Sequence, residues 1–142
     1  MRIMSLDVGE KRIGVAMSDS LAMFATPLTI LAAKAPEIFR EIASLVKEHQ
    51  VDLLIVGLPL TLQGGVGHQA EWVQVFVQDL EGEVRVPIEF VDERLSTVEA
   101  VRYMQDASVK KERQKAMVDA VAAAVILQSY LDRHAMLPSE SD

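Results

Sequence analysis

Short apolar runs separated by polar turns predict five strands. The predicted strands cover residues 3–8, 13–17, 23–31, 51–58 and 87–91. The polar turn at 9–12 joins the first two runs in the manner of an antiparallel hairpin. Pro27 lies inside the third run and indicates an edge strand or a bulge. Residues 53–56 are continuously apolar, which is typical of a strand covered by helices on both faces.

Apolar residues at helical spacing predict three longer helices and one short one. The longer helices are expected over residues 36–50, 71–80 and about 112–134. In the second of these, Trp72 and Phe76 are predicted to belong to the core rather than to a base-stacking platform. The short helix follows the last strand, where Ser96 and Glu99 match the spacing of a capping box. Ser96 is therefore expected to be its N-cap.

The order of these elements predicts an α/β protein. Strands and helices alternate after an opening antiparallel meander, which is typical of a mixed sheet flanked by helices. The chain has 142 residues, the usual size of one domain. We expect that domain over residues 1–137, followed by a short C-terminal tail at 138–142.

Composition narrows the class of protein. Hydrophobic residues make up 50% of the chain and charged residues 25%, as in globular proteins. The chain contains no cysteine, which excludes disulfide bonds, a thiol nucleophile and thiolate metal sites. The first residues lack the pattern of a signal peptide, and the apolar run at 116–127 is too short to span a bilayer. We expect a soluble, intracellular protein without a membrane partner.

Charge is distributed unevenly along the chain. The net charge of −7 argues against a protein that coats nucleic acid. Residues 71–93 carry seven acids and one base, whereas residues 94–118 carry six bases and three acids. A basic segment on an acidic body fits an enzyme that contacts nucleic acid over a small footprint. An ordinary solvated loop fits the charge pattern equally well.

Acidic residues stand in three settings that disfavour a lone charge. Asp7 lies inside the first apolar run, and Asp119 is the only polar residue in the apolar run at 116–127. Asp92 and Glu93 follow each other at a strand end, so their side chains point to opposite faces and one of them can enter a given site. Each acid also has a structural interpretation: Asp7 as a solvated strand end, and Asp119 as a partner in a salt bridge or a helix N-terminal contact.

Gathered together, these carboxylates would form a site for hard divalent cations. They would repel one another and raise each other's pKa values unless such ions neutralised them. Oxygen ligands favour Mg²⁺ or Mn²⁺, and two such ions can activate water and stabilise the leaving oxygen of a phosphodiester. The acids therefore favour a nuclease.

Four motifs, in the same order, resemble the YqgF/RuvX family. They are LDVGEKRIGVA at 6–16, VGLPL at 56–60, VDERLST at 91–97 and VDAVAA at 118–123. The resemblance covers essentially the whole chain and departs from the family pattern in the loop at 61–68. The family is Holliday-junction-resolvase-like and is also described as a pre-16S rRNA nuclease. The residue that ends this loop, His68, is predicted to be a surface histidine at a helix start.

The resemblance implies an RNase H-like fold with a five-stranded mixed sheet and a central first strand. It implies a cytoplasmic metal-dependent nuclease, using Mg²⁺ or Mn²⁺, that acts in 5′-end processing of pre-16S rRNA. By motif, Asp7, Glu93 and Asp119 would be the catalytic metal ligands. The basic residues expected to meet substrate phosphate are Lys11, Arg12, Arg94, Lys110, Lys111 and Arg113.

Other functions stay open at this point. Branched DNA is an alternative substrate to structured or precursor RNA, and a pre-ribosomal particle and a second copy of the chain are candidate partners. The D-x-G stretch that begins at Asp7 is also similar to the phosphate loop of the actin-like superfamily, which would make the chain a nucleotide-binding protein. That superfamily clamps nucleotide between two domains, and this chain has room for one. A binding protein without chemistry is the third alternative.

Overall fold

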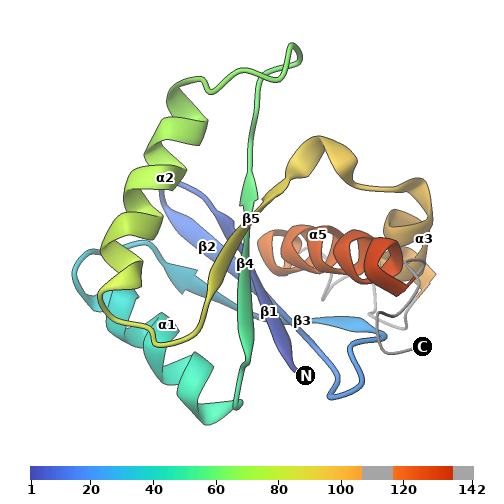
Figure 1. Cartoon of the computed structure of the whole chain (residues 1–142), viewed down its shortest axis with the longest axis horizontal. Coiled ribbons are helices and arrows are strands. Elements are labelled where there is room, and N and C mark those ends of the chain that lie inside the picture. Colours follow the sequence, from blue (N-terminus) through green and yellow to red (C-terminus); the bar gives the residue numbers. More distant parts are fainter. Residues whose placement is uncertain (107–116, 136–142) are drawn as a thin grey trace.

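The computed structural model describes residues 1–106 and 117–135. At its centre is a five-stranded sheet with the order β3-β2-β1-β4-β5 (Figure 1). The strands are β1 (Ile3–Val8), β2 (Arg12–Ser18), β3 (Ala25–Ala32), β4 (Leu53–Leu58) and β5 (Ile88–Asp92). β2 is antiparallel to β1 and β3, whereas β4 is parallel to β1 and β5 is parallel to β4. The sheet is therefore mixed and β1 is central, as the family resemblance implies.

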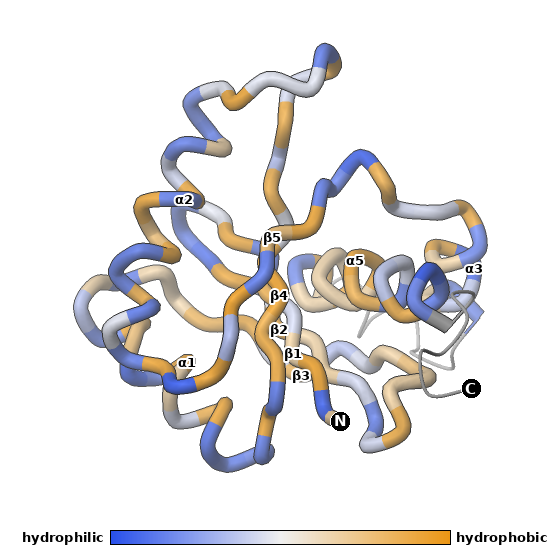
Figure 2. Tube along the Cα trace, in the orientation of Figure 1, coloured by the Kyte–Doolittle hydropathy of each residue, from blue (hydrophilic) through white to orange (hydrophobic). Residues whose placement is uncertain are grey.

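Helices cover both faces of this sheet (Figure 1). On one face lie α1 (Glu37–Glu48) and α2 (His68–Glu81), and on the other lie α3 (Val98–Asp106) and α5 (Val118–Ala135). A 3-10 turn, η1 (Glu93–Leu95), leads from β5 toward α3. The central strands are mostly hydrophobic (Figure 2), because both faces of the sheet are buried. The α/β architecture predicted from the sequence is confirmed.

Side chains of β1 alternate between the two faces of the sheet. Met4, Leu6 and Val8 belong to the core formed with α1 and α2. Ser5 faces α5, where its hydroxyl donates a 2.7 Å hydrogen bond to the Ala123 carbonyl. Asp7 is two residues further along the strand, so its side chain points to the α5 side as well.

Small residues let α5 pack closely on the sheet. Ala120, Ala123 and Ala124 are completely buried on the helix, and Ala16 is completely buried on β2. At Gly14 the contact is closest, because a Cβ there would overlap the backbone carbonyl of Asp119 and lie 2.8 Å from the Ala120 nitrogen. The alanine-rich composition of α5 is thus explained by its close approach to β2.

The predicted edge position of Pro27 is confirmed. It lies in β3, which is an outer strand of the sheet. The pairing of β2 with β3 is also irregular between Val15 and Ala16, at the level of Pro27. A proline removes a ladder hydrogen bond, and an edge strand with a bulge tolerates that loss.

The predicted cap of the short helix is wrong by one residue. α3 begins at Val98, and the Ala100 N–H donates a 3.1 Å hydrogen bond to Thr97 Oγ1, so Thr97 is the capping residue. The Ser96 N–H is used by η1, where it bonds to the Glu93 carbonyl at 3.2 Å. Because of this extra turn the helix begins one residue later than predicted. Glu99 is therefore not at the third helical position, which a capping box requires.

Two further predictions concern the C-terminal part and the membrane. The predicted last helix is present as α5, but its expected first residues, 112–116, lie outside the described residues. Within the ranges that the structure describes, no helix is both long and apolar enough to cross a bilayer.

Candidate active site

The carboxyl ends of β1, β4 and β5 lie at one edge of the sheet, because these strands run in the same direction. Asp7 is near the end of β1, Gly57 is near the end of β4, and Glu93 directly follows β5. In open α/β sheets this edge is the usual position of a ligand site. The strand order therefore brings together two of the acids singled out in the sequence.

Asp7 and Glu93 form a hydrogen-bonded carboxyl pair. Burial, followed by the neighbouring Asp7 carboxylate, raises the pKa of Glu93 to about 7. Burial also raises the pKa of Asp7, with the charge of Asp119 adding to the increase and the hydrogen bond with Glu93 opposing it. The raised pKa means that Glu93 keeps its proton to a higher pH than a free glutamate does, as expected of a buried carboxyl group beside another acid.

Gly57 provides the space that the Glu93 side chain occupies. A Cβ at residue 57 would lie 2.7 Å from Glu93 Oε1 and 2.8 Å from Ile126 Cδ1, closer than side-chain atoms pack. Gly57 therefore positions Glu93 against Asp7. Sequence reasoning missed this role, although a lone glycine inside an apolar strand is a recognised signal of close approach.

Asp119 reaches the same region from α5. Its backbone lies over Gly14, and Gly14 is the residue of β2 that pairs with Asp7 of β1. The Asp119 carboxylate, however, is paired with Arg12: Oδ2 lies 2.9 Å from the Arg12 Nε, and the Asp119 side chain is 32% exposed. Of the three partners considered for Asp119, the structure contains the salt bridge. Its exposure also shows that the first turn of α5 is less buried than the apolar run suggests.

A hollow of about 290 Å³ opens in front of the carboxyl pair. It is lined by Asp7, Glu93, Ser96, Ala122, Val125 and Ile126. Ser96 is exposed and lines the same hollow as the two carboxyl groups, which its interpretation as a helix cap did not anticipate. Three of these residues are polar and the three from α5 are apolar, a combination common in binding sites.

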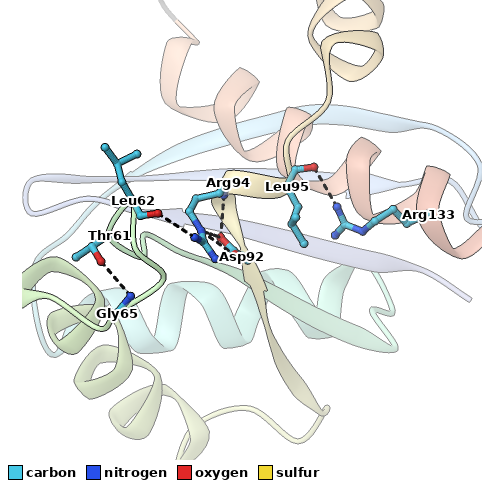
Figure 3. A network of polar contacts seen from close by, with 7 residues as sticks. All are labelled: Thr61, Leu62, Gly65, Asp92, Arg94, Leu95 and Arg133. Atoms are coloured by element: carbon cyan, nitrogen blue, oxygen red, sulfur yellow. Dashed lines mark hydrogen bonds and ion pairs between the residues drawn. The ribbon is translucent and has the colours of Figure 1, made fainter.

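Arg94 is turned toward Asp92 (Figure 3). Its Nε and Nη2 atoms bond to the Asp92 carboxylate at 3.0 Å and 2.6 Å, and Nη1 lies 3.5 Å from the Leu62 carbonyl. The hydrogen bonds from Arg94 lower the pKa of Asp92, so this carboxylate is charged. Asp92 and Glu93 thus have different partners, which agrees with their expected opposite orientations.

The loop after β4 is held beside Arg94 by its own hydrogen bonds (Figure 3). The Gly65 N–H donates a 3.0 Å hydrogen bond to Thr61 Oγ1, and the Gly64 N–H donates a 2.8 Å bond to the Thr61 carbonyl. Gly64 has a φ of +85°, a conformation that favours glycine, and the Arg94 guanidinium lies against it. The loop that departs from the family pattern therefore contacts the motif that carries Glu93.

The remaining predicted substrate-binding residues are spread more widely. Lys11 is exposed in the hairpin turn beside Arg12. Lys110, Lys111 and Arg113 lie outside the described residues. His68 is exposed at the start of α2, as predicted.

Trp72 departs from the predicted core position. Its side chain is 39% exposed, whereas that of Phe76 is 8% exposed. Trp72 borders a second hollow of about 450 Å³, together with Val8, Glu10, His68 and Gln69. Trp72 lies on the same side of α2 as Phe76 but one turn nearer the start of the helix, where its side chain is less covered.

The donor chemistry at the edge fits a hard divalent cation. Asp7 and Glu93 offer carboxylate oxygens, and their pKa values are raised by burial first and by neighbouring acidic charges second. A bound cation would offset both effects. Among the residues that the structure describes, no three acidic or histidine side chains come together as a complete metal-binding group. Asp119 is the nearby acid whose carboxylate is turned elsewhere.

Known proteins resemble this chain over almost its full length. The family model described as "RuvX: Holliday junction resolvase" matches residues 1–133. A Roseiflexus sp. (strain RS-1) protein named "Putative pre-16S rRNA nuclease" is 51% identical over 132 residues, which cover 92% of this chain and 94% of that protein. A Moorella thermoacetica protein of the same name is 45% identical over 136 residues, with 94% and 96% covered.

Solved structures resemble it in fold. Thermus thermophilus RuvC in complex with a Holliday junction substrate superposes with a TM-score of 0.62 at 11% identity, covering 96% of each chain. The fowlpox virus Holliday junction resolvase gives a TM-score of 0.56 at 16% identity, covering 94% of this chain and 99% of that one. At these identities the likeness concerns the fold alone, and it identifies the sheet as RNase H-like.

Proposed function

The chain belongs to the RuvX family of nucleases, and on that premise we propose that it is a divalent-metal-dependent nuclease acting on pre-16S rRNA. The observation that carries the proposal is the hydrogen-bonded pair of Asp7 and Glu93 at the carboxyl edge of an RNase H-like sheet. The names of the relatives support the RNA substrate and, with it, a cytoplasmic location and contact with a pre-ribosomal particle.

Asp7, Glu93 and Asp119 would hold the metal ions. When Mg²⁺ or Mn²⁺ is bound, it supplies an activated water and neutralises charge on the phosphodiester. Asp7 is the central ligand of the proposal, because its strand is central and its carboxyl group interacts with both of the other acids. Gly57 and Gly14 position Glu93 and the Asp119 backbone by leaving space for them.

Substrate would approach over the exposed rim of the hollow. Ser96 offers a hydroxyl-bearing side chain in the lining of the hollow, and Arg12 and Lys11 offer cations on the hairpin. Guanidinium groups bind phosphate oxygens through more than one N–H, so Arg12 suits contact with the phosphate backbone of the nucleic acid. Arg94 would contact phosphate only after leaving Asp92.

The test is cleavage of end-labelled RNA spanning the 5′ end of 16S rRNA, with Mg²⁺, Mn²⁺ or a chelator. We expect the wild type to cut with either metal and the Asp7→Asn variant to lose at least about 100-fold in rate, as for a missing metal ligand. Asp79→Asn is the matched control, because Asp79 is an exposed acid on α2. Cleavage that persists in chelator, or in Asp7→Asn, would contradict the proposal.

A Holliday junction is the second candidate substrate, because the description of the matching family model names a Holliday junction resolvase. A labelled four-way DNA junction in the same assay separates the two. Preferential cutting of the junction would replace the RNA assignment and leave the proposed catalytic residues in place.

A further inference from the structure

The Arg12 side chain forms an ion pair with Asp119, the acid that would complete the metal-binding group. Its Nε lies 2.9 Å from Asp119 Oδ2. In the described part of the chain there are two ion pairs between side chains, and the other joins Arg94 to Asp92. The pair between Arg12 and Asp119 is therefore the one that engages a proposed metal ligand.

The backbone of Asp119 is fixed beside Asp7. Gly14 pairs with Asp7 across the sheet, and the Asp119 carbonyl packs directly on Gly14. Paired residues of neighbouring antiparallel strands have Cα atoms roughly 4.5–5.5 Å apart, so the start of α5 lies next to the Asp7 side chain. While it is paired with Arg12, the Asp119 carboxylate is already close enough for its charge to raise the pKa of Asp7. Turning this carboxylate toward Asp7 would therefore need a side-chain rotation and no movement of the helix.

The backbone of Arg12 is also held in place, while its side chain is largely exposed. The Gly9 N–H donates a 2.9 Å hydrogen bond to the Arg12 carbonyl, which closes the hairpin turn. The Arg12 side chain is 64% exposed and contacts Asp119 through one nitrogen. Exposed single-contact pairs of this kind contribute little to stability, so this one can be exchanged readily.

We infer that Arg12 and the divalent cation compete for Asp119, and that Arg12 becomes available for substrate phosphate when the carboxylate turns to the metal. This inference rests on the proposed metal-dependent function. The Asp119 carboxylate neutralises the guanidinium while the metal site is incomplete. Once that carboxylate faces a cation beside Asp7, the guanidinium loses its counter-ion and a phosphate oxygen can replace it. Arg12 thereby makes phosphate binding depend on metal binding.

The first measurement is Mn²⁺ binding without nucleic acid, followed by the electron paramagnetic resonance signal of free Mn²⁺. Arg12→Met keeps the aliphatic part of the side chain and removes the competitor, so we expect Mn²⁺ to bind about three- to tenfold more tightly. Lys11→Met is the matched control. It removes the same charge from the same exposed turn but not the contact with Asp119, and we expect less than about a twofold change.

The second measurement follows Arg12 in the wild-type protein and needs no folded variant of residue 12. The ¹⁵Nε–¹Hε resonance of Arg12 reports its hydrogen bond to Asp119. Titration with Mg²⁺ should move this resonance toward the position of a free arginine, with the same midpoint as metal binding. In Asp119→Asn the resonance should start near the free position and stay there.

The outcomes separate this inference from the proposed function. Equal effects of Arg12→Met and Lys11→Met on Mn²⁺ affinity, or an Arg12 resonance that Mg²⁺ leaves unmoved while it binds, would overturn the competition and leave the nuclease proposal standing. A wild-type protein that binds neither Mn²⁺ nor Mg²⁺ at millimolar concentration would overturn both. Tighter Mn²⁺ binding in Arg12→Met together with a metal-dependent Arg12 resonance supports the competition.

Discussion

The backbone of Asp119 occupies the space in which a side chain at Gly14 would begin. A Cβ at residue 14 would overlap the Asp119 carbonyl and lie 2.8 Å from the Ala120 nitrogen. Because Gly14 pairs with Asp7, this contact sets the position of the third acid relative to the first. The close packing of α5 on the sheet is therefore also a feature of the candidate active site.

Replacing Gly14 with alanine should push the start of α5 away from β2. The obstructing atoms belong to backbone, which relaxes poorly, so we expect a loss of about 2–4 kcal/mol in the free energy of unfolding. Cleavage should fall with it, because Asp119 moves with the helix. Urea unfolding followed by circular dichroism measures the first effect.

Gly82→Ala is the control for this substitution. Gly82 has a φ of −72° at the end of α2, and a Cβ there would lie 3.6 Å from the Asp79 carbonyl, an ordinary contact. We expect Gly82→Ala to change stability by no more than about 1 kcal/mol, with stabilisation the expected sign. Equal losses in the two variants would mean that Gly14 has no special packing role.

Replacing Gly57 with alanine should affect activity more than stability. The new methyl group would meet the end of the Glu93 side chain, 2.7 Å away, and the Ile126 methyl group, 2.8 Å away. Both are side-chain ends that can move, so unfolding free energy should fall by about 1–2 kcal/mol at most. Cleavage should fall at least about tenfold, because a displacement of Glu93 by 1 Å disturbs the site. Normal activity in a folded Gly57→Ala protein would show that Glu93 need not occupy its observed position.

Much of the fold could be predicted from the sequence because hydrophobic periodicity and turns determine it locally. The two-sided apolar run in β4 and the proline in β3 indicated a covered strand and an edge strand, and both are confirmed. Boundaries were less predictable. Ser96 and Thr97 are both good capping residues, and the choice between them depends on the η1 turn, which leaves no periodic signal.

The candidate site was predictable where an acid interrupts an apolar run. Asp7 and Asp119 stand out for that reason, whereas Glu93 could be separated from Asp92 only by the family resemblance. The partners of Arg12 and Arg94 were not predictable. A long side chain can reach several groups, and its choice depends on how the hairpin, α5 and the loop after β4 come together. Gly57 and Gly14 acquire their roles through the same tertiary contacts.

The metal-free protein should lose stability as pH rises through the range in which Glu93 titrates. Its pKa is about 7 in the folded state and 4.5 as a free group, so the folded state holds the proton more tightly. The stabilising contribution is complete below pH 4.5 and is lost as pH rises through about 7. After allowance for solvent screening of this half-exposed group, we expect a change of about 1–2 kcal/mol.

Glu93→Gln should flatten this part of the stability profile, since glutamine does not titrate. Thermal unfolding in chelator between about pH 4 and 8 tests the prediction. A wild-type profile that rises with pH over this interval, or one that Glu93→Gln leaves unchanged, would mean that the carboxyl pair does not titrate as its surroundings require.

The Asp7→Asn variant separates a catalytic acid from a structural one by the sign of its effect on stability. Burial and the charge of Asp119 raise the pKa of Asp7, so its ionised form is disfavoured in the metal-free fold. Removing the charge should stabilise the metal-free protein by about 1 kcal/mol at pH 8 and by less at pH 4, where the raised pKa leaves Asp7 less ionised. Added Mg²⁺ should then raise the melting temperature of the wild type but not of Asp7→Asn, because ligand binding stabilises only a protein that retains its site.

If the acids merely held the fold together, Asp7→Asn would be less stable than the wild type at pH 8, with or without metal. Differential scanning calorimetry of both proteins, in chelator and in Mg²⁺, distinguishes these outcomes.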